Sequence, residues 1–177
     1  NERYLLDFVN DENNCISFAS SLSATQIPKN KEGIYKKNLS KYKGITLREK
    51  ECAIQLENIC GVEVNVILDP TLMLGYEYWS DFKADINESN YVLIYLLGTR
   101  ISTRLIVNEI ALKYKKKVFD FPFMEGVYIK ADTVLETANE LWDVSPSEWI
   151  SWIDKSDIII TDSFHMTAFS IMFHKNF

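Results

Sequence analysis

The stretch GITLREKECAIQLENICGVEVNVILDP (residues 44–70) decides the fold class, because two strand-like segments flank one helical segment. Its middle part has apolar residues at helical spacing, namely Cys52, Ala53, Leu56 and Ile59. Gly61 follows, as a glycine that ends a helix commonly does. The segment VEVNVILDP then predicts a strand that Pro70 closes. A strand–helix–strand order predicts a parallel sheet with helices packed on it.

The same alternation extends to both sides of this stretch. Upstream, NCISFASSL (14–22) predicts a short strand and KEGIYKKNLSKY (31–42) a helix. Downstream, YVLIYLL (91–97) is apolar throughout, which is typical of a strand buried on both faces. The later segments are a helix within 99–117, a strand at 117–123, a helix at 145–156 opened by Ser145 and Pro146, a strand at 157–161 and a helix at 163–173.

The alternation occurs twice, with a break between the two sets. Residues 76–90 hold scattered aromatic residues without a long period, and we interpret them as an inter-domain crossover. The predicted architecture is therefore α/β, with two Rossmann-like units that have parallel sheets. Residues 1–75 would be part of the N-terminal unit and residues 91–177 part of the C-terminal unit.

Composition narrows the function classes. The chain of 177 residues has a net charge of −6, which disfavours a general nucleic-acid binder. No apolar run approaches the roughly 20 residues of a membrane span. The three cysteines are odd in number and lack C-x-x-C spacing, so we expect reduced thiols in a cytoplasmic protein, with no metal site.

A candidate site follows the strand at 157–161, where Asp162, Ser163 and His165 open the next helix. Ligands of open α/β sheets bind beyond the carboxyl ends of the strands. Asp162 or Ser163 can cap the helix, and the N–H groups of its first turn favour an anion. His165 there would be neutral or paired with an anion, or else a half-buried histidine satisfied by a neighbour. A hydrolase triad is excluded, because the G-x-S-x-G elbow is absent.

Two further positions lie at predicted strand ends. Arg48 could hold a carboxylate or phosphate with its planar fork, although spacing alone favours a salt bridge with Glu49 or Glu51. Gly98 and Arg100 follow the strand at 91–97 and could approach a phosphate or sugar. They form neither a dinucleotide fingerprint nor a P-loop, so this motif is weak.

Several segments in this order resemble the polysaccharide pyruvyl transferase family. They are YLLDFV, ISFASSL with the later IP, ITLREK, VILDPTLML, YVLIYLLG, DVSPSEWISWI and IITDSFHMTAFSIMF. Met166 departs from the family, which usually has glycine after the histidine, and we expect it to narrow the space beside the helix N-terminus. The family's glycine-rich N-terminal segment and the stretch after residue 177 are missing, so we expect a chain truncated at both ends.

The resemblance implies a glycosyltransferase-B-like fold and a ketal pyruvyltransferase. Such an enzyme takes phosphoenolpyruvate and attaches its pyruvyl group to two hydroxyls of a sugar, in a surface polysaccharide or a lipid-linked precursor. By motif, the donor-binding arginine maps to Arg48 and the essential histidine to His165. No cofactor or metal ion is implied.

Two alternatives stay open at this point. One is a nucleotide-sugar glycosyltransferase of similar fold, in which the phosphate-binding helix would hold a diphosphate. The other is a non-catalytic remnant that binds a glycan. The missing segments also leave open whether this stretch of chain is active by itself, and the acceptor sugar is not encoded in any of these motifs.

Overall fold

The computed structural model describes residues 2–9, 15–98, 100–122, 135 and 138–177. The chain folds as two compact units, residues 1–73 and 74–177, each of which is described by itself. Both units are α/β with parallel sheets, which confirms the predicted fold class. No helix among the described residues has both the length and the apolar character needed to cross a membrane.

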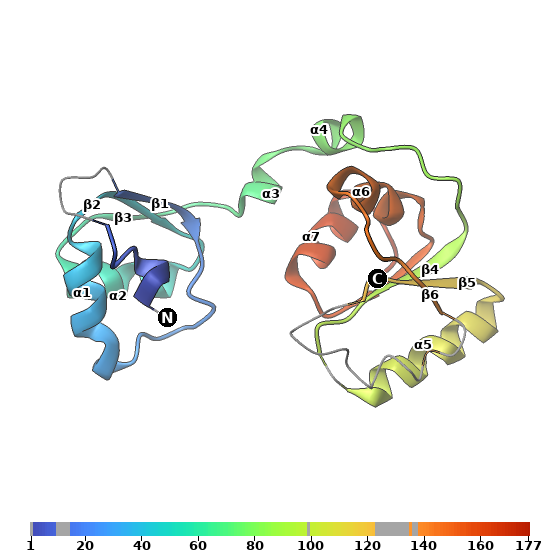
Figure 1. The fold of residues 1–177 in the computed structure, drawn as a ribbon, viewed down its shortest axis with the longest axis horizontal. Helices are drawn as coiled ribbons and strands as arrows, with labels where there is room; N and C mark the ends of the chain where they lie inside the picture. The colour runs from blue at the N-terminus through green and yellow to red at the C-terminus, as the bar shows by residue number, and fades with distance from the viewer. Residues whose placement is uncertain (1, 10–14, 99, 123–134, 136–137) are drawn as a thin grey trace. The chain divides into compact units, whose positions relative to one another are not determined.

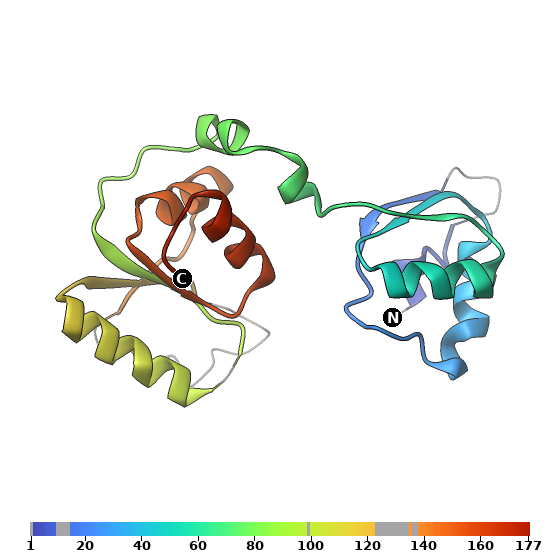
Figure 2. The ribbon, with the colours of Figure 1, turned by 180° about the vertical axis from the view of Figure 1, so that it is seen from behind.

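The first unit is a three-stranded parallel sheet with helices on one face. Its elements are η1 (Glu2–Leu5), β1 (Cys15–Ser20), η2 (Lys29–Lys31), α1 (Glu32–Leu39), β2 (Tyr42–Leu47), α2 (Lys50–Cys60), β3 (Val64–Val66) and α3 (Pro70–Met73). The strand order is β1-β2-β3, so each strand pairs with the next one along the chain. Both longer helices lie on the same face of this sheet (Figure 2), and their apolar sides share one core with β2.

The stretch at 44–70 forms the elements it predicts, with shifted boundaries for both strands. Leu56 and Cys52 of α2 are fully buried against Leu47 of β2, and Gly61 ends the helix in the left-handed region, at φ 69°. β2 begins two residues earlier than expected, at Tyr42. β3 ends at Val66, so the predicted strand at 62–70 is much shorter than its apolar residues suggested.

The second unit is a four-stranded parallel sheet with helices on both faces. Its elements are α4 (Tyr76–Asp81), β4 (Tyr91–Tyr95), α5 (Ile101–Tyr114), β5 (Lys117–Asp120), β6 (Ala138–Glu140), α6 (Pro146–Lys155), β7 (Ile158–Thr161) and α7 (Phe164–Met172). The strand order is β6-β5-β4-β7, which places β4 between two neighbours. α5 lies on one face of the sheet, and α6 and α7 lie on the other (Figure 1).

The alternation along β4 explains this layering. Val92 and Ile94 face α5 and share a core with its Val107, whereas Tyr91 and Leu93 face the opposite layer. That second core continues through aromatic contacts into α4 and α7, where the rings of Trp79 and Phe169 lie 5.0 Å apart between centroids, edge to face. A strand buried on both faces has no polar side to present, which is why YVLIYLL carries no alternating pattern.

Candidate functional site

The carboxyl ends of β4 and β7 bring five of the six predicted site residues together, all except Arg48. The two strands pair in register, with Tyr95 opposite Thr161, so the residues after them leave the sheet side by side. The carboxylate of Asp162 reaches across, accepting the backbone N–H of Leu97 at 2.6 Å and that of Gly98 at 2.8 Å. Asp162 therefore connects the two loops at this edge.

Gly98 lies too close to this carboxylate for any side chain. A Cβ at position 98 would be 2.7 Å from Oδ2 of Asp162, closer than real Cβ contacts come. A side chain here would therefore push the Asp162 carboxylate away from the two N–H groups that it accepts. The sequence suggested Gly98 for phosphate or sugar binding, but its contact with Asp162 already explains a glycine at this position.

Arg104 holds the same loop from inside the fold. It is 1% exposed, and its Nη1 donates to the carbonyl of Gly98 at 2.7 Å and to that of Arg100 at 3.5 Å. The sequence did not single out this residue, although a signal was present. Arg104, Val107 and Ala111 follow one helical stripe, and all three are buried. A charged residue on a buried stripe indicates a specific polar task.

Ser163 is the N-cap of α7. Its hydroxyl accepts the backbone N–H of Met166 at 3.5 Å, and its own N–H donates to the hydroxyl of Thr161 at 3.0 Å. Ser163 is buried, so its role in the structure is to start the helix. Of the two residues predicted as candidates for this cap, Ser163 caps the helix. The Asp162 carboxylate accepts the N–H groups of the loop after β4 instead.

His165 lies exposed on the first turn of α7, beside the ring of Phe164, at 5.2 Å between ring centroids. The next residue, Met166, is fully buried in the core between the sheet and the helices α6 and α7. The expectation that Met166 narrows the space beside the helix N-terminus is therefore wrong, because its side chain points into the core. His165 and the start of α7 remain accessible.

Tyr95 borders the same edge as a neutral phenol. Its burial raises its pKa above the ordinary value, and the negative charge of Asp162 raises the pKa further. Arg100 is exposed just before α5, on the loop that Asp162 and Arg104 hold. The structure thus gathers Gly98, Arg100, Asp162, Ser163 and His165 at one edge of one sheet.

Arg48 belongs to the other unit, directly after β2. Its guanidinium donates to the carboxylate of Asp69, which is 4% exposed and also accepts from the backbone N–H of Thr71 at 2.9 Å. Glu49, one of the two partners that spacing suggested, accepts instead from the hydroxyl of Ser21. The sequence was therefore right about an ion pair but wrong about the partner. The Arg48 side chain remains 26% exposed.

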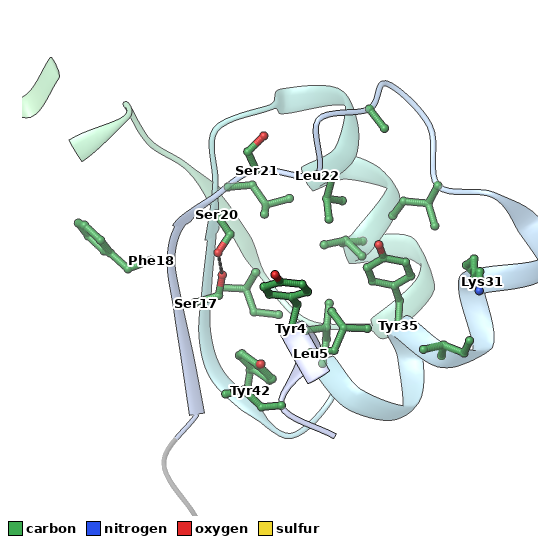
Figure 3. Close-up of a pocket in the computed structure, with 18 of the residues that line it drawn as sticks. Tyr4, Leu5, Ser17, Phe18, Ser20, Ser21, Leu22, Lys31, Tyr35 and Tyr42 are labelled. Atoms are coloured by element: carbon green, nitrogen blue, oxygen red, sulfur yellow. Dashed lines mark hydrogen bonds between the residues drawn. The ribbon is translucent and has the colours of Figure 1, made fainter. Parts of the chain in front are cut away.

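A cavity of about 740 Å³ lies in the first unit, between β1, η1 and α1. Figure 3 shows Tyr4, Tyr35 and Tyr42 among the residues around it, with Ser17 and Ser20 along the strand, where the Ser17 hydroxyl donates to that of Ser20. None of the residues predicted for the site lines this cavity, although the segments YLLDFV and ISFASSL, which carry the family resemblance, supply part of its lining. Among the described residues, no three His, Cys, Asp or Glu side chains gather as a metal ion would require.

Two parallel-sheet units, with charged and polar residues collected where the strands end, define a Rossmann-like α/β protein. The chain belongs to the polysaccharide pyruvyl transferase family, whose model matches residues 2–177. The resemblance seen in the sequence is thereby confirmed over essentially the whole chain, and membership indicates transfer of a pyruvyl group to a polysaccharide acceptor. No curated protein and no solved structure matches the chain.

Proposed function

We propose that this protein is a ketal pyruvyltransferase that uses phosphoenolpyruvate as donor and two hydroxyls of one sugar as acceptor. The sugar belongs to a surface polysaccharide or to its lipid-linked precursor. The observation that carries this proposal is the family match over residues 2–177. Nothing in the geometry favours a nucleotide-sugar glycosyltransferase or a non-catalytic glycan binder over it.

The reaction needs an acid and a clamp for anions. Protonation of the methylene carbon of phosphoenolpyruvate makes C2 electrophilic, and one sugar hydroxyl adds to it. The C2–O bond to phosphate then breaks, and the second hydroxyl adds to C2 to close the ketal. Of the two hydroxyl protons, one restores the acid and the other leaves on inorganic phosphate, so that atoms and charge balance.

We assign His165 as the acid that protonates the donor. Alternatively, His165 binds the phosphate of the donor. Its exposed place on the first turn of α7 supports this assignment, since the N-terminal turn of a helix favours a phosphate, and a bound phosphate favours the protonated imidazole. Arg100, on the facing loop, is the second group that we assign to the donor anion, while Gly98, Asp162 and Ser163 shape this edge.

We assign Arg48 to a carboxylate or phosphate oxygen of the donor. Its guanidinium is partly exposed, and the ion pair with Asp69 would fix the plane of the fork in advance. An arginine that is oriented before binding loses less side-chain entropy when the donor arrives.

The test is phosphate release from phosphoenolpyruvate by the full-length enzyme, with and without the source organism's polysaccharide after mild-acid removal of its pyruvate. We expect release only when the polysaccharide is present. His165→Asn should lower kcat at least 100-fold, in the range of a lost general acid, and His174→Asn, at the chain's other histidine, is the matched control. Equal rates for these two variants would refute the assignment of His165.

We also propose a cytoplasmic location, where phosphoenolpyruvate is available. The three cysteines support it, because all of them are buried as free thiols in the described structure. Fractionation of cells that express the full-length protein tests this proposal, and recovery in a secreted fraction would contradict it.

A further inference from the structure

We propose that the cavity under β1 binds a segment of the acceptor saccharide. This inference rests on the proposed function and adds to it a second binding site, in the first unit. The cavity of about 740 Å³ is within the range of roughly 300–1,000 Å³ that ligand pockets occupy. It is large enough for more than one sugar ring.

The lining has the two kinds of group that a sugar needs. Three tyrosines (Tyr4, Tyr35 and Tyr42) present ring faces and hydroxyls, and three serines (Ser17, Ser20 and Ser21) lie along and just after β1. Beneath the cavity lie aliphatic side chains of the unit's core, namely Leu39, Ile45, Leu47 and Leu56, each at most 5% exposed. The C–H face of a pyranose packs on aromatic and aliphatic surface, while its hydroxyls replace the water around the serines and tyrosines.

The charge of the lining agrees with a neutral ligand. Of the described residues that line the cavity, Lys31 is the one that carries a charge, and it lies exposed at the start of α1. A purely hydrocarbon guest is disfavoured, because it would strip water from the hydroxyls of the serines and tyrosines without replacing their hydrogen bonds. An oligosaccharide suits a wall that carries both apolar and hydroxyl-bearing side chains.

The wall at η1 is held in place by Lys41. Its Nζ donates to the carbonyl of Leu6 at 2.7 Å and to that of Val9 at 2.9 Å, and Leu5 packs on the core. Tyr4 therefore stands on the rim of the cavity although it is 86% exposed. An exposed aromatic ring on a fixed turn at the rim is suited to stacking on a sugar.

The cavity leads toward the strand end that carries Arg48. Ser20 ends β1 and Ser21 follows it, and the Ser21 hydroxyl donates to Glu49, the residue after Arg48. Within this unit, the end of the cavity wall at Ser20 thus lies beside the backbone of Arg48, whose N–H donates to the Ser20 carbonyl at 3.0 Å, at the carboxyl edge of one sheet. Ligands of parallel sheets bind at that edge.

Two variants test the cavity without disturbing the core. Tyr4→Ala removes an exposed ring, and Ser20→Trp places bulk at an exposed position on the wall. In the full-length enzyme, we expect each variant to raise KM for the de-pyruvylated polysaccharide about five- to tenfold. KM for phosphoenolpyruvate should stay within about twofold of the wild-type value. Tyr114→Ala, an exposed tyrosine at the end of α5, is the matched control.

Binding without turnover separates this inference from the proposed function. Titration calorimetry with the same polysaccharide, in the absence of phosphoenolpyruvate, should show weaker binding by Tyr4→Ala and Ser20→Trp than by the wild type and Tyr114→Ala. If the wild type releases no phosphate but this pattern of binding holds, the proposed reaction fails and the cavity assignment stands. Unchanged polysaccharide affinity in both variants, or an equal rise in the two KM values, overturns the cavity assignment.

Discussion

At the scale of single residues, the loop after β4 is fixed from two sides. Asp162 accepts its N–H groups and Arg104 donates to its carbonyls, so that the chain near Gly98 has little freedom. A buried guanidinium is stable only when its N–H groups are satisfied, and backbone carbonyls of a turn supply fixed acceptors. The position of the loop beside α7 therefore depends on Asp162 at the same edge and on Arg104 inside the fold.

We expect Arg104→Met to lower the free energy of unfolding by about 1–3 kcal/mol, because the carbonyl of Gly98 loses its buried partner. Arg104→Lys should recover part of this loss, since an ammonium group can reach one carbonyl. Urea unfolding followed by tryptophan fluorescence measures the difference, since all four tryptophans lie in the second unit. A methionine variant as stable as the wild type would show that the buried hydrogen bonds contribute nothing net.

We expect opposite effects from alanine at two glycines. Gly98→Ala should destabilise by about 1–3 kcal/mol, because its Cβ would press on Asp162. Gly33→Ala, in α1 with nothing within 4 Å of the new Cβ, should stabilise by up to about 1 kcal/mol through helix propensity. Thermal unfolding of both variants checks the signs, and a neutral Gly98→Ala would mean that the loop moves freely away from Asp162.

At the scale of elements, α6 shows how local sequence can fix a helix start. The Ser145 hydroxyl accepts the N–H of Glu148, and the Glu148 carboxylate accepts the N–H and hydroxyl of Ser145. Pro146 follows at the first helical position. This reciprocal cap needs only four consecutive residues, so the sequence alone predicts it.

We expect Ser145→Ala to cost about 1 kcal/mol of stability at neutral pH, measured by chemical unfolding.

Hydrogen bonds from Ser145 hold the pKa of Glu148 below its ordinary value of 4.5. Such a group stabilises the fold above its unfolded pKa, and this contribution is lost as the pH falls through the lowered folded value. The difference between the wild type and Glu148→Ala should therefore be present at pH 7 and shrink below about pH 4.5. A difference that is constant from pH 7 to pH 3 would contradict this assignment.

At the scale of the whole molecule, each unit has a core of its own. The first is centred on Leu47 and Leu56, and the second on β4 with helices on both faces. Local stability in such a chain depends on the nearest core, and it can be measured for each unit by hydrogen exchange.

We expect Leu56→Ala to cost about 2–5 kcal/mol within the first unit, because a fully buried side chain leaves a cavity. Amide protection should fall in residues 15–66 more than in β4, α6 and α7. Ile153→Ala, at a fully buried position of the second core, is the reciprocal variant. Equal loss of protection across the whole chain in both variants would show that the chain unfolds as one cooperative body.

Most of the order of strands and helices could be predicted from the sequence, because hydrophobic period, caps and helix-ending glycines act over a few consecutive residues. The three-residue strand β6 was not predicted. The place of His165, Ser163 and Asp162 after a strand, at the start of a helix, followed from the same local signals. Only the tertiary structure decided the neighbours: β4 in the middle of its sheet, Asp69 rather than Glu49 beside Arg48, Arg104 under the Gly98 loop, and Met166 in the core. These depend on residues far apart in the chain, whose meeting is set by packing and by the need to satisfy every buried polar group, and no short stretch of sequence encodes that balance.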